Sequence, residues 1–113
     1  MAWQEMQVVN VTNGGARPFA FEYQESKAAV GNGTSILIPD DVKSVAVILD
    51  VTAGTGSIQT TTDSVAKVKA GTATWITWSY GTVGVDTAAV FSPVTAIRMV
   101  NASGTTELLV RAQ

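Results

Sequence analysis

The chain has 113 residues, a net charge of −2 at neutral pH, and charged side chains at only 14% of its positions. It contains neither cysteine nor histidine, which excludes disulfide frameworks, thiol nucleophiles, cysteine-ligated metals and any mechanism that needs a histidine base. The basic residues are scattered, and only Lys67 and Lys69 lie close together. We therefore expect no role in nucleic acid binding, which usually shows as a basic stripe.

The apolar runs are short, and none approaches the length that crosses a bilayer. The opening residues, Met1 to Glu5, show no basic segment followed by an apolar core, so we expect no signal peptide and synthesis in a cytoplasm. The length suits one domain that needs no metal or disulfide to bury its core. We expect a single domain over residues 1–113, with no cofactor, no metal site, no catalytic residue and no membrane contact.

Val, Ile and Thr dominate the sequence and are interrupted roughly every eight to twelve residues by Gly, Asn, Asp or Pro, a pattern typical of short strands and turns. Trp3 to Val11 alternates and predicts a first strand. Arg17 to Tyr23 places its aromatic residues on one face, and Thr34 to Ile38 predicts a third strand that ends at Pro39. The pair Asp40-Asp41 fits a turn better than a calcium site, which needs more oxygen ligands.

Ser44 to Val51 is the most apolar run and predicts a central strand. Asp50 falls on the face opposite its valines, where burial would require a partner such as Arg98. Three further elements are expected next in the chain: a turn at 53–56, a polar edge strand at 57–62 and a short strand at 65–68.

Thr72 to Trp78 alternates, which puts Trp75 and Trp78 on opposite faces of one strand. After an irregular stretch from Tyr80 to Val90, a final hairpin is expected, with arms at 94–100 and 106–111 and a loop at 101–105. Strands at this spacing predict an all-β fold, an antiparallel two-sheet sandwich for which the jelly roll is one form and a closed barrel is the alternative.

The aromatic residues are the strongest candidates for a binding site. At least one of Trp75 and Trp78 points away from a one-sided core, and exposed Trp and Tyr are used by protein interfaces and sugar-binding surfaces. Burial of both tryptophans is the alternative. The candidate interface comprises Trp3, Trp75, Trp78 and Tyr80.

The segments 45–62, 69–75 and 93–101 together resemble small virion proteins of tailed bacteriophages and prophages. This resemblance covers roughly residues 44–111 and is one of composition more than of chemical motif. It implies a capsid decoration or cement protein on the virion surface, with the major capsid protein as its partner and a homo-oligomer, dimer or trimer, as its form. It carries over no functional residues.

Two other functions are consistent with the sequence. A carbohydrate-binding module on a phage surface or tail would use Trp78 and Tyr80 as a stacking platform. A head–tail connector or tail component would form closed rings. Enzymatic activity is the weakest hypothesis, because no pair of carboxylates is singled out by its spacing.

Overall fold

The structure is a computed structural model, and it describes residues 3–9, 20–40 and 42–113. Its strands are β1 (Trp3–Glu5), β2 (Gln7–Val9), β3 (Ala20–Lys27), β4 (Gly31–Asn32), β5 (Ser35–Leu37), β6 (Val45–Thr61), β7 (Ile76–Thr77), β8 (Thr87–Phe91) and β9 (Ala96–Ala112). The helix α1 (Val65–Ala70) lies between β6 and β7.

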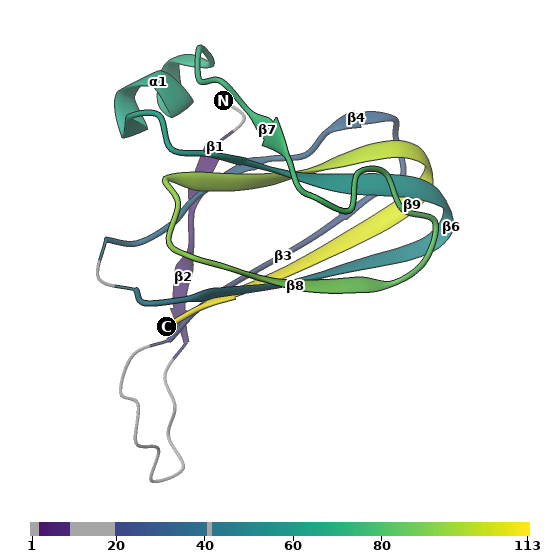
Figure 1. Ribbon diagram of the computed structural model, residues 1–113, viewed down its shortest axis with the longest axis horizontal. Helices are drawn as coiled ribbons and strands as arrows, with labels where there is room; N and C mark the ends of the chain where they lie inside the picture. Colours follow the sequence, from purple (N-terminus) through teal and green to yellow (C-terminus); the bar gives the residue numbers. More distant parts are fainter. Residues whose placement is uncertain (1–2, 10–19, 41) are drawn as a thin grey trace, which may run out of the picture.

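Two long antiparallel strands, β6 and β9, organise the fold. Each has 17 residues, and they pair along their whole length from Val45 opposite Ala112 to Thr61 opposite Ala96. Both strands bend at their midpoint, so the pair turns back over itself and forms two layers (Figure 1). In one layer, β6 pairs with β8, and β9 pairs with β3, which is followed by β2. In the second layer, β6 pairs with β7, and β9 pairs with β4 and with β5, which is followed by β1.

Glycines at the bend allow the two strands to turn together. Gly54 and Gly104 lie opposite each other with φ angles of 98° and 70°, in the region that favours glycine. A Cβ atom on Gly104 would collide with the carbonyl oxygen of Ala53. The register shift between Val51 and Ala53 marks a bulge on β6, and the shift between Thr55 and Gly56 marks a bulge on β9, where Ala102 is skipped. Bulges increase local bending.

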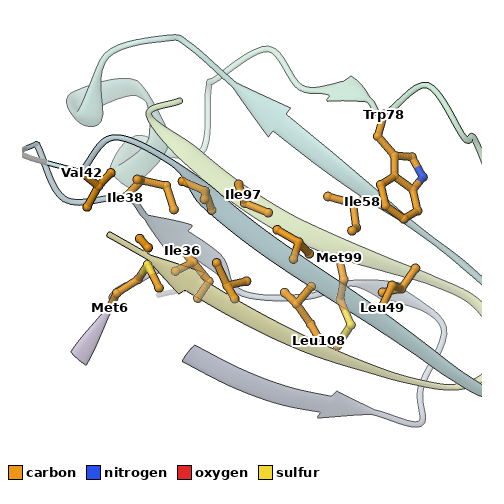
Figure 2. Packing of buried hydrophobic residues seen from close by; sticks show 14 of the residues in the cluster. Met6, Ile36, Ile38, Val42, Leu49, Ile58, Trp78, Ile97, Met99 and Leu108 are labelled. Carbon is orange, nitrogen blue, oxygen red and sulfur yellow. The ribbon is translucent and has the colours of Figure 1, made fainter. Parts of the chain in front are cut away.

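The inner surfaces of the two layers form the main hydrophobic core (Figure 2). Alternate residues of the first half of β6 point inward, as the sequence predicts. The residues of this core that have no solvent exposure include Ile36, Val45, Leu49, Ile58, Ile97, Met99, Leu108 and Val110. Burial of each large aliphatic side chain contributes roughly 1.5–3 kcal/mol, so this interior is the main source of stability.

The predicted all-β class is confirmed. The arrangement of the strands differs in three ways from the expected antiparallel two-sheet sandwich. The described strands form one continuous sheet of nine strands instead of two separate sheets. That sheet is mixed, because β1 pairs with β5 in parallel. The first strand is interrupted at Met6, which is buried, so β1 joins one layer and β2 the other. The expected continuation beyond Val9, and Asp41, lie outside the described residues.

Several predicted boundaries were wrong for related reasons. The turn at 53–56 and the hairpin loop at 101–105 are the bends of β6 and β9, which remain continuous strands. Residues 57–61 are not an edge, since they lie between β9 and β7. The irregular stretch 80–90 includes most of β8. Residues 65–68 belong to α1 instead of a strand, because Ser64 and Gly71 cap a helix there.

Candidate protein interface

A second, smaller apolar cluster lies on the outer surface of the layer that contains β5 and β7. Leu37 and Ala96 are paired across β5 and β9, and Val68 of α1 packs on them. The partly buried side chains of Trp3, Ala73 and Trp75 surround this cluster. It therefore brings together two tryptophans that are far apart in the sequence.

The caps of α1 hold the helix in place beside this cluster. The Ser64 hydroxyl accepts a hydrogen bond from the backbone N–H of Lys67 at 3.3 Å, which satisfies a free donor of the first turn. Gly71 follows the helix with φ of 77°, and its N–H donates to the Val68 carbonyl at 3.2 Å, as in a helix-ending motif that favours glycine. The short helix presents Lys69 toward Trp3.

Two cation–indole pairs form on this outer surface. The Nζ atom of Lys69 lies 4.4 Å from the centre of the Trp3 ring, and the guanidinium carbon of Arg98 lies 4.3 Å from the centre of the Trp75 ring. Contacts of this kind contribute roughly 0.5–2 kcal/mol each. We call the surface formed by Trp3, Lys69, Trp75 and Arg98 the indole–cation face.

Arg98 is held in a defined orientation. Its Nε–H donates to Gln59 Oε1 at 2.8 Å, and Gln59 Nε2 donates to Thr77 Oγ1 at 3.4 Å. Arg98 and Gln59 are directly opposite each other on β9 and β6. Partial burial lowers the pKa of Arg98 below its usual value, and the group remains a cation at neutral pH because that value is so high. The charged guanidinium group of Arg98 is therefore held over the indole ring of Trp75.

The structure separates the four aromatic residues of the candidate interface into two groups. Trp3 and Trp75 belong to the indole–cation face, whereas Trp78 is only 6% exposed and lies in the main core. Its Nε1–H donates to the Gly81 carbonyl. Tyr80 is 58% exposed and packs edge-on against Trp78, with ring centres 5.1 Å apart.

This placement corrects two expectations. Trp78 has no exposed ring face on which a sugar could stack, so the expected Trp78–Tyr80 platform is not formed. Trp75 and Trp78 belong to different clusters, but the alternating strand expected over 72–78 is wrong. Only Ile76–Thr77 form β7, and Ile76 is 63% exposed although it shares the parity of the buried Trp78. Sequence reasoning missed the roles of Lys69 and Arg98. The position of Arg98 between the buried Ile97 and Met99 was the available signal, because it directs the side chain outward.

Acidic side chains gather at the bend, far from the indole–cation face along the strands. Asp50 lies opposite Glu107 on β9, and Asp86 Oδ1 accepts a hydrogen bond from the Val51 N–H at 3.0 Å. A hydrogen bond and charge repulsion from Asp86 raise the pKa of Asp50, with smaller contributions from burial and Glu107. The expectation that Arg98 is the partner of Asp50 was wrong, because Arg98 stacks on Trp75 in the other layer.

Within the described residues, no group of three or more acidic side chains is arranged to hold a metal ion. Among the same residues, no helix has the length and apolar character needed to cross a membrane.

Comparison with protein families and with curated proteins finds no match. Among solved structures, the chain is similar to one described under the words "Bacillus endospore appendages form a novel family of disulfide-linked pili". The TM-score is 0.38 and the sequence identity 15%, and the match covers 93% of this chain and 96% of the other.

Proposed function

We propose that this chain is a non-enzymatic structural protein that attaches to other proteins through the indole–cation face. The observation that carries the proposal is the Trp75–Arg98–Gln59 arrangement, in which an arginine is oriented on an indole ring at the surface of a folded sheet. Tryptophan and arginine are the residue types that most often dominate binding energy at protein interfaces. A surface that holds them in place loses little conformational entropy on binding.

The charge of the face indicates the chemistry of its partner. Lys69 and Arg98 engage indole rings, and the ion pair found among the described residues involves neither of them. Their N–H donors remain suited to carboxylates, which arginine binds with two parallel hydrogen bonds. We infer an acidic protein surface as the partner.

The particle that we propose is the shell of a tailed bacteriophage, on which this protein would bind the major capsid protein and bridge neighbouring capsid subunits. The compositional resemblance of residues 44–111 to small virion proteins supports this location. The mechanism would be added contact area, since each copy increases the free energy needed to separate the subunits it touches.

Binding to isolated shells tests the proposal. We expect the purified protein to bind shells that lack it and to raise the temperature at which they disrupt. Arg98→Ala should weaken binding by at least about tenfold, as expected for an interface hot spot. Arg111→Ala is the matched control, because Arg111 is an exposed arginine on the same strand whose contact to Glu22 is a long 4.0 Å. Equal binding by both variants, or no binding by the wild type, would exclude the proposal.

A further inference from the structure

One side of the β8 backbone faces no other described strand. The strand pairs with β6, and among the described strands it has no second neighbour. The other described strands with a single partner, β1, β2, β4 and β7, have two or three residues each, whereas β8 has five. Among the described strands, β8 is therefore the longest that lacks a neighbour along one whole side.

This edge also lacks the features that usually prevent strand pairing. Natural edge strands carry lysine, proline or a bulge, but the β8 sequence is Thr-Ala-Ala-Val-Phe and its pairing with β6 has no register shift. Val90 of β8 is 75% exposed, and Ile48, on the same outer surface, is 47% exposed. An open, uncharged edge beside exposed apolar side chains is suited to accept another strand.

The backbone groups that are free on β8 follow from the pairing of β6. Ser44 and Gln113 exchange two N–H to carbonyl bonds, each of 3.1 Å, so even-numbered residues of β6 direct their backbone groups toward β9. Odd-numbered residues therefore face β8, where their register partners are Thr87, Ala89 and Phe91. The N–H and C=O groups of Ala88 and Val90 must then point away from the sheet.

We propose that two copies of this chain pair through antiparallel β8 strands, with a two-fold axis at Ala89. Ala88 of each copy then lies opposite Val90 of the other, and the outward N–H and C=O groups of both residues are satisfied reciprocally. The sheet continues from one molecule into the next, and the exposed Val90 packs beside the small Ala88 of its neighbour. This pairing goes beyond the proposed function, because it concerns contact between copies rather than attachment to a shell.

Charge favours the antiparallel arrangement over a parallel one. Asp86 directly precedes β8 and belongs to the acidic group at the bend. In the proposed register it faces Ser92 of the second copy, so the two Asp86 carboxylates are about 20 Å apart along the strands. That separation exceeds the screening length of about 8 Å at physiological ionic strength, whereas parallel strands would place the two carboxylates side by side.

Cysteine cross-linking tests the register directly, since the chain has no cysteine of its own. In the proposed pair, the two Ala89 residues face each other as a non-hydrogen-bonded pair with Cα atoms about 4.5 Å apart, which a disulfide can bridge. The two Ala88 residues are offset by two positions and lie about 8 Å apart, too far for a disulfide. We expect oxidised Ala89→Cys to run as a covalent dimer and Ala88→Cys to remain a monomer. Equal cross-linking of both variants, or none, would overturn the proposal.

Sedimentation of the full chain provides a second test that does not depend on introduced cysteines. Val90→Pro removes an outward N–H without removing a bond to β6, so its thermal unfolding should stay cooperative while dimer affinity falls by at least about tenfold. Ile48→Lys, on the same outer surface but on a central strand, is the control and should still dimerise.

Two outcomes would contradict the pairing. One is a wild-type chain that remains monomeric up to about 1 mM, and the other is a dimer that survives Val90→Pro but is lost with Ile48→Lys. The second result would indicate face-to-face packing. Shell binding measured on the same Val90→Pro protein reports separately on the proposed function, because the indole–cation face lies on the other layer.

Discussion

Asn101 is a fully buried amide that connects three parts of the chain at the bend. Its Nδ2 group lies within donor distance of the carbonyls of Lys27 and Ala29, both at 3.1 Å, and of Gly104 at 2.8 Å. Its Oδ1 accepts a hydrogen bond from the Thr106 hydroxyl at 2.9 Å. Because buried polar groups are costly when unpaired, this one side chain holds the β3–β4 connection against the bend of β9.

Replacing Asn101 should therefore destabilise the fold strongly. We expect Asn101→Ala to lower the free energy of unfolding by about 2–4 kcal/mol, because it leaves buried carbonyls and a hydroxyl without their partner. Thr106→Val, which removes only the hydroxyl bond, should cost about 1 kcal/mol. Urea unfolding followed by tryptophan fluorescence compares the two, and similar losses would contradict the proposed role of the amide.

Asp50 gives the stability a defined dependence on pH. Its pKa is raised in the folded state, first by the hydrogen bond and charge of Asp86, so the folded chain binds a proton here more readily than the unfolded chain does. This contribution is fully present below the ordinary Asp pKa of about 4 and is lost as the pH rises through the raised value. Asp50→Asn should therefore raise the melting temperature at pH 7 and change it less at pH 3. A difference that does not vary with pH would exclude this explanation.

At the scale of the elements, the glycines of the bend and of the helix cap make different demands. Gly54 and Gly104 lie where two strands approach closely, whereas a Cβ on Gly71 would meet nothing within 4 Å. Both kinds of position have positive φ, but only the bend also forbids a side chain by collision. The bend is therefore the more restrictive use of glycine.

This difference gives a matched pair of substitutions. Gly71→Ala should cost about 1 kcal/mol, the usual penalty of a left-handed alanine. Gly104→Ala should cost about 3 kcal/mol or more, because the strands must also separate to avoid the Ala53 carbonyl. Thermal unfolding of both variants measures the difference. Equal penalties would mean that the bend can relax around a methyl group.

The glycines also show why sequence reasoning located these sites but misread them. A glycine between apolar runs indicates a positive φ or a close approach, and this signal is the same in a hairpin turn and in a bend shared by two strands. Only the pairing of residue 54 with residue 104 distinguishes them, and that pairing is set by distant parts of the chain. The helix was missed although Ser64 and Gly71 are ordinary cap residues, because Val65 and Lys67 also fit a strand pattern.

At the scale of the whole molecule, strand content and the inward side chains were predictable, while layer membership was not. Alternation within 45–51 identified the buried face because it is a local property. The packing of Trp3 and Trp75 against the same cluster could not be predicted from the sequence, because it depends on a parallel β1–β5 pair and on a helix that covers the same surface. Spatial neighbours separated by about seventy positions cannot be inferred from spacing alone.

The end-to-end pairing of β6 with β9 has a consequence for how the chain reaches its native state. Residue 45 must find residue 112, so the loop that closes is long and its entropy is lost before most of the interior can form. During synthesis, β6 cannot form this pairing until β9 has left the ribosome. We expect refolding in milliseconds to seconds, as in other proteins rich in distant contacts, measurable by stopped-flow fluorescence of Trp78, and a corresponding need for protection of the nascent chain.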